Sequence, residues 1–114
     1  MIKTLSHISL STKNLENPKK FYVKILGFKI IHKFLDKNKK EYGFFLKCGN
    51  KTFLEFFKSK TKPKIINTNL RHICFQVSNI KKIKILIEKK LKRKLSIKEI
   101  LKFKTVKDIN LILK

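Results

Sequence analysis

The chain has 114 residues and a formal net charge of +23, from 30 lysine and arginine residues against 7 aspartate and glutamate residues. This length fits one domain with a modest core, and the absence of any apolar run near the roughly 20 residues that cross a bilayer argues against a membrane protein. The N-terminal segment MIKTLSHISL lacks the pattern of a secretory signal, and the two cysteines are too few for a disulfide framework, so we expect a cytoplasmic protein.

The positive charge invites a nucleic-acid-binding interpretation. The basic residues are spread along the whole chain, however, and only Arg71 and Arg93 carry the guanidinium fork that reads guanine or clamps phosphate. A hydrated lysine surface is therefore the favoured interpretation, and nucleic acid is not an expected partner. Such a surface still attracts anions and would steer an anionic substrate inward.

The first predicted strand covers residues 5–11, where polar and apolar side chains alternate strictly. His7, Ser9 and Ser11 fall on one side of this strand, and Ile8 and Leu10 fall on the other. The pattern is typical of a half-buried strand with a polar outer side.

A helix is predicted at about residues 18–26. Asn17 and Pro18 supply an N-cap and a first-turn proline, and Gly27 ends the helix. The apolar stripe at helical spacing consists of Phe21, Tyr22, Ile25 and Leu26.

Three further strands follow, separated by a polar hairpin and a tight turn. The strands are expected at 28–35, 42–47 and 52–58, the hairpin at 36–40 and the turn at 48–51. On the last strand, Phe53, Glu55 and Phe57 share one face. A carboxylate between phenylalanines is costly to bury alone, so Glu55 needs a hydrogen-bond donor, a cation or a metal.

The strand pattern TLSHISLST at 4–12 returns as NLRHICFQV at 69–77, which places His72 at the position equivalent to His7. His72, Cys74 and Gln76 line one face of this second strand. A helix from about 80 to 91 follows, capped by Ser78 or Asn79. Its predicted core side consists of Ile80, Ile83, Leu86 and Ile87, and three short strands are expected at 94–101, 103–107 and 111–114.

The element order is therefore βαβββ followed by βαβββ. We expect a single domain, residues 1–114, with a first module at about 1–58, a linker at 59–69 and a second module at about 70–114. The fold class is α+β.

Three segments resemble the vicinal oxygen chelate superfamily, the group of glyoxalases, bleomycin-resistance proteins and extradiol dioxygenases. They are HISLSTKNLENPKKFYVKILGFKII, GNKTFLEFF and LRHICFQVSNIKKIKILIEKK. The resemblance implies a glyoxalase-like fold, in which two tandem βαβββ modules form a cup-shaped mixed sheet. It also implies a small-molecule substrate and a homodimer, with the modules either exchanged between chains or not.

Members of this superfamily that bind a metal carry its ligands on the first and fourth strands of each module, which implies His7, Glu55 and His72 here. The fourth ligand position falls at Leu113, which cannot bind a metal. Two imidazoles and a carboxylate form a facial triad for a divalent ion such as zinc, nickel, manganese or iron. The expected cofactor is such an ion, with Glu55 as the catalytic group, or none because Leu113 leaves the site incomplete.

Other polar and aromatic side chains are expected to line a substrate cavity around these ligands. They are Ser9, Ser11, Phe53, Phe57, Cys74 and Gln76. The alternative is that the polar groups are ordinary hydrogen-bonded or hydrated side chains and that the phenylalanines belong to the core. His32 lies outside the repeat and is expected on the surface.

Three functions follow, in order of preference. The first is a glyoxalase-like, metal-dependent lyase or isomerase of a small oxygenated metabolite, similar to lactoylglutathione lyase. The second is a metal-free protein of the bleomycin-resistance type, which binds or sequesters a small molecule. The third is a nucleic-acid binder that uses its lysines, with an affinity that falls steeply with salt.

Overall fold

The computed structural model describes residues 1–61, 73 and 75–96. The chain divides into two compact units, Met1–Lys64 and Ile65–Lys114. Two predicted site residues, His72 and Cys74, lie outside the described residues. Leu113, at the position of the missing fourth ligand, and the strands expected in the last part of the chain also lie outside them.

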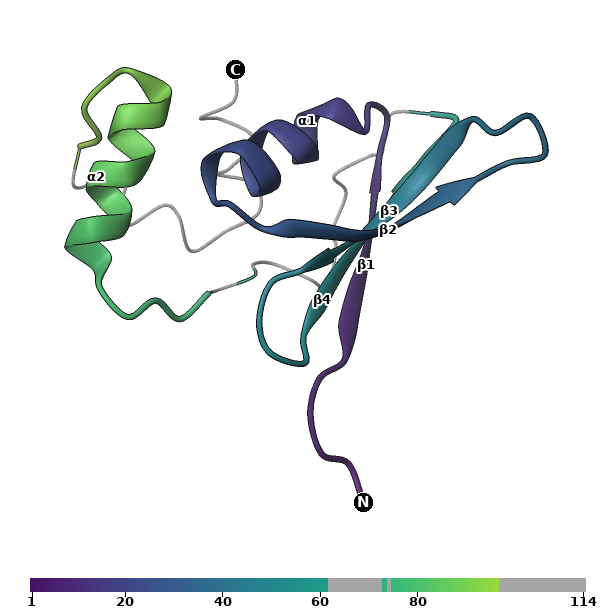
Figure 1. The fold of residues 1–114 in the computed structure, drawn as a ribbon, viewed down its shortest axis with the longest axis horizontal. Helices are drawn as coiled ribbons and strands as arrows, with labels where there is room; N and C mark the ends of the chain where they lie inside the picture. Colours follow the sequence, from purple (N-terminus) through teal and green to yellow (C-terminus); the bar gives the residue numbers. More distant parts are fainter. Residues whose placement is uncertain (62–72, 74, 97–114) are drawn as a thin grey trace. The chain divides into compact units, whose positions relative to one another are not determined.

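The first unit is built on a four-stranded mixed sheet, in the order β1-β4-β3-β2 (Figure 1). The strands are β1 (His7–Thr12), β2 (Lys29–Leu35), β3 (Glu41–Lys47) and β4 (Phe53–Lys58). β1 runs parallel to β4, whereas β2 with β3 and β3 with β4 are antiparallel. All four strands predicted from alternation and turn residues in this unit are confirmed.

A helical connection leads from β1 to β2. A short helix, α1 (Glu16–Pro18), continues directly as a π-helix, η1 (Lys19–Ile25). The helix starts earlier than predicted, at Glu16, so that Asn17 lies inside it and is not its N-cap. In the turn before the helix, the Asn14 side chain accepts the Glu16 N–H at 2.9 Å. It ends at Gly27, whose φ of 78° lies in the left-handed region that glycine tolerates best.

The core of this unit lies between the helix and one face of the sheet. Tyr22 of η1 contacts Phe56 of β4 with ring centroids 5.3 Å apart, and Phe56 stacks on Phe44 of β3 at 5.3 Å. Burial raises the pKa of Tyr22 to about 12. The side chains at 5% exposure or less are Phe21, Tyr22, Phe44, Leu46, Leu54 and Phe56.

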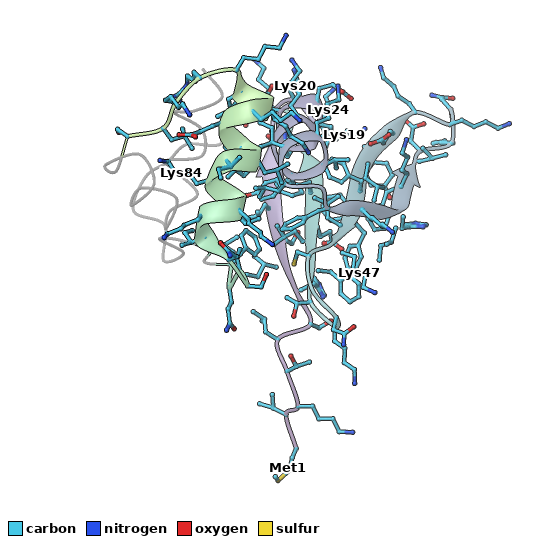
Figure 2. All side chains as sticks on the ribbon, turned by 60° about the vertical axis from the view of Figure 1, so that its left-hand side comes forward. Met1, Lys19, Lys20, Lys24, Lys47 and Lys84 are labelled. Atoms are coloured by element: carbon cyan, nitrogen blue, oxygen red, sulfur yellow. The ribbon has the colours of Figure 1, made fainter. Side chains whose placement is uncertain are left out.

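One ion pair ties the helix to the first residue of the inner strand β3. The Lys19 ammonium lies 2.6 Å from Oε1 of Glu41 at the start of β3, and 5.3 Å from the ring centroid of Phe44. That oxygen accepts no hydrogen bond of good geometry in the described part of the chain, so the contact is chiefly electrostatic. Lys20 and Lys24 of the same helix are exposed (Figure 2).

The described part of the second unit contains the helix α2 (Ile80–Leu91), as predicted. The Asn79 side chain accepts the Lys82 N–H at 3.0 Å and is therefore the N-cap. Ile87 is 3% exposed, but Ile80 and Leu86 are 59% and 37% exposed, so the predicted core side is only partly right.

The buried side of α2 includes Glu88, which was not among the predicted core residues. Oε1 of Glu88 accepts the Leu95 N–H at 2.8 Å, and the Lys84 and Lys94 ammonium groups lie 3.6 and 3.8 Å from the Glu88 carboxylate. The Leu95 N–H, followed by these lysines, lowers the pKa of Glu88. Within the described ranges, no helix has both the length and the apolar character needed to cross a bilayer.

Candidate functional site

The face of the sheet turned away from the helix, here called the outer face, carries three rows of side chains that each cross all four strands. The strand register aligns the residues from β1 to β2. The first row is His7, Phe53, Lys47 and Lys29. The second row is Ser9, Glu55, Phe45 and His32, and the third row is Ser11, Phe57, Gly43 and Phe34. All six candidates predicted on the first and fourth strands therefore share this face.

Aromatic rings lie around Glu55, both in its own row and in the rows on either side. On one side, the Phe53 ring stacks at 5.3 Å on that of Phe45, which belongs to the row of Glu55, and the His7 ring is 5.6 Å from that of Phe45. On the other side, the ring centroid of Phe57 lies 5.1 Å from that of Phe34 and 6.0 Å from that of Tyr42. The outer face thus offers an aromatic surface with one carboxylate between its two ring clusters.

Glu55 is half-buried at the centre of this arrangement. Within residues 1–61, 73 and 75–96, no donor or cation contacts its carboxylate. The partner that a carboxylate needs among phenylalanines is therefore not supplied by the described residues. This leaves its oxygens accessible to water or a ligand.

His7 and Glu55 are diagonal neighbours on the parallel strands β1 and β4, because His7 aligns with Phe53 and Ser9 aligns with Glu55. His7 is exposed, and its Nδ1 lies 3.4 Å from the Ser6 Oγ. His72, the third ligand of the predicted triad, is outside the described residues, and so is Cys74; Gln76 is described and exposed. In the described part of the chain, His, Cys, Asp and Glu side chains do not gather in a group of three that could hold a metal, so the triad stays a prediction.

His32 is exposed, as expected, and its ring packs 4.8 Å from that of Phe34. Its side chain belongs to the same row as Glu55, two strands away. The alternation of the sequence could not show this, because a bulge between Ile30 and His32 shifts the register of β2.

A hollow of about 300 Å³ lies at the end of the first row and was not predicted. It is lined by Gly27, Phe28, Lys29, Lys47 and Gly49. Lys29 and Lys47 are direct cross-strand partners. This pairing could have been predicted, because Lys29 and Lys47 are equally far in sequence from the centre of the predicted hairpin at 36–40.

Solved structures with a similar arrangement place the chain in the class of α+β proteins with a glyoxalase-like fold, which confirms the predicted fold class. The glyoxalase family protein from Enterococcus faecalis has a TM-score of 0.61 and 27% identity, over 77% of this chain and 72% of that chain. SMU.1112c has a TM-score of 0.62 and 25% identity, over 76% and 74%. An integron cassette protein from the mobile metagenome of the Halifax Harbour sewage outfall has a TM-score of 0.54 and 30% identity, over 78% and 72%.

The family model described as Glyoxalase/Bleomycin resistance protein/Dioxygenase superfamily matches residues 4–108. The chain belongs to this superfamily, as the resemblance of its sequence indicated. No curated protein matches the chain. The superfamily contains several reaction types, so its membership alone does not define an activity.

Proposed function

We propose that the chain is a metal-dependent lyase or isomerase of the glyoxalase type, whose metal is held by His7, Glu55 and His72. The observation that carries this proposal is the diagonal placement of His7 and Glu55 on one face of adjacent parallel strands. The lack of a donor or cation at Glu55 within the described ranges supports it, because a divalent ion would neutralise that carboxylate. Imidazole and carboxylate ligands suit zinc, nickel, manganese or iron.

The substrate would be a small oxygenated metabolite that binds on the outer face. A bound divalent ion would polarise a carbonyl oxygen of such a molecule and favour removal of a neighbouring proton. Glu55 would take up and return this proton, and the rings of Phe53 and Phe57 on the same strand would limit the access of water. Ser9, the register partner of Glu55, would orient the substrate with its hydroxyl group.

Metal-free binding is the second candidate, favoured by the ring clusters on both sides of Glu55. A flat, apolar ligand could stack on these rings without any metal. The leucine at position 113, where the superfamily's fourth metal ligand would fall, also favours this candidate. For either function, we propose a homodimer as the working assembly.

Elemental analysis of untagged protein, purified without chelators, tests the metal proposal. We expect a stoichiometric divalent metal in the wild type and its loss in His7→Ala and in His72→Ala. The matched control is His32→Ala, which removes an exposed histidine from the same face and should retain the metal.

Two outcomes would contradict the metal site. One is the absence of metal from every sample, even after incubation with zinc, nickel, manganese and ferrous ions. The other is equal retention of metal in His7→Ala and His32→Ala. The first outcome, combined with saturable binding of an aromatic compound, would support the metal-free candidate.

A further inference from the structure

We infer that Lys29 and Lys47 form a binding site for the phosphate or carboxylate group of a ligand, at one end of the outer face. The inference deepens the proposed function, on which it rests, by naming the charge class of the substrate. Lys29 of β2 and Lys47 of β3 are direct antiparallel partners. Their Cβ atoms are therefore about 5 Å apart, close enough for both ammonium groups to contact one oxyanion.

The two lysines border the hollow of about 300 Å³ described above. Two of the lining residues, Gly27 and Gly49, have no side chain, and the space beside them is open. A Cβ atom added at Gly27 would have no neighbour within 4 Å, and one added at Gly49 would meet only Cβ of Thr52, at 3.8 Å. Gly49, one of the lining residues, also has a backbone N–H without an acceptor in the described part of the chain. An anion can therefore approach without displacing a side chain.

The charges of this pair are not balanced within the described ranges. Four lysines have a carboxylate partner in the described ranges: Lys19 and Lys33 contact Glu41, and Lys84 and Lys94 contact Glu88. Lys29 and Lys47 contact no carboxylate there, although like charges directly opposite each other destabilise a strand pair. A bound anion would remove this repulsion.

The C-terminal end of the helix, which lies beside the hollow at Gly27, would ordinarily disfavour an anion. This helix end carries only about half an elementary negative charge, whereas each ammonium group carries a full positive charge. The two ammonium groups therefore dominate the local field.

The position of the pair also defines the shape of the ligand. The row that contains both lysines continues through Phe53 to His7 on β1. Two strand spacings of about 4.8 Å separate Lys47 from His7, so the matching ligand is roughly 10 Å long. It carries an oxyanion at one end and oxygen atoms suited to a metal at the other. In Figure 2, Lys47 lies apart from Lys19, Lys20 and Lys24 of the helix.

The test is an NMR titration of ¹⁵N-labelled full chain with inorganic phosphate at constant ionic strength, and in parallel with acetate. We expect saturable amide shifts at residues 27–29 and 47–49, and at least tenfold weaker binding in the double variant Lys29→Gln, Lys47→Gln. The matched control, Lys37→Gln with Lys39→Gln, removes two lysines from the hairpin tip and should bind as the wild type does. Tighter binding of phosphate than of acetate would identify a phosphorylated ligand. Tighter binding of acetate than of phosphate would identify a ligand with a carboxylate group.

Shifts that spread over many lysines without saturation, or that are equal in the two double variants, would overturn the inference. The metal content of the same samples keeps the two proposals apart, because neither lysine belongs to the metal site. Stoichiometric metal without saturable anion binding would overturn the lysine site alone. Absence of metal with saturable binding at residues 27–29 and 47–49 would overturn the metal site alone.

Discussion

Replacement of Phe44 by alanine should lower the free energy of unfolding by about 3–5 kcal/mol, because a fully buried ring leaves a cavity behind. Phe44 is 0% exposed and stacks on Phe56 between the sheet and the helix. Since small domains are stable by only about 5–15 kcal/mol, this variant should be close to unfolding at room temperature. Urea titration followed by circular dichroism measures the change.

Phe45→Ala is the matched control, because it removes the same side chain from the next position on β3. Phe45 points to the outer face, is half-buried and stacks on Phe53. Its loss should reduce the free energy of unfolding by about 1–2 kcal/mol. Equal losses for the two variants would show that the core and outer faces of the sheet are wrongly assigned.

Gly43→Ala should lower the free energy of unfolding by about 1–3 kcal/mol, through overpacking. A Cβ atom at Gly43 would lie 2.5 Å from Cδ1 of Phe57 and 2.7 Å from the carbonyl oxygen of Phe56. The ring could turn away, but the carbonyl belongs to β4, which is paired with β3 and β1, and cannot move independently. The substitution should therefore also displace Phe57 from its place on the outer face.

The control for this substitution is Gly49→Ala, where the new Cβ would meet only Thr52 Cβ, at 3.8 Å. It should change the free energy of unfolding by about 0.5 kcal/mol or less. Thermal unfolding of both variants under the same conditions checks the difference. Similar midpoints for the two variants would contradict the close packing of Phe57 over Gly43.

The strands of the first unit could be predicted because their side chains alternate and polar turns separate them. In the hairpin, Asp36 Oδ1 accepts the N–H groups of Asn38 and Lys40 at 2.8 and 2.9 Å, which explains why that turn was recognisable. The π-helix was not predictable, since apolar spacing such as that of Phe21, Tyr22 and Ile25 fits either kind of helix. Strand order was not predictable either, because the pairing of β1 with β4 joins distant parts of the chain.

For the candidate site, alternation could fix which side of a strand each residue occupies, as it did for His7 and Glu55. It could not fix the partner on the neighbouring strand, because that depends on register and bulges. The Lys29 and Lys47 pair was missed for another reason, because the lysines were treated as a uniform surface. On α2, helical spacing alone predicted that Leu86 belongs to the core, but Leu86 is exposed. The buried side of the helix instead includes Glu88, whose carboxylate accepts the Leu95 N–H.

The most direct test of the outer-face site is a titration of the ¹⁵N-labelled chain with Mn²⁺ alone, followed by the broadening of its amide signals. We expect that signals of residues 7–9 and 53–55 are lost first, and that His7→Ala abolishes this selectivity. Broadening centred on Asp36 or Glu41 instead, or a pattern that His7→Ala leaves unchanged, would contradict a metal site on the outer face of the sheet.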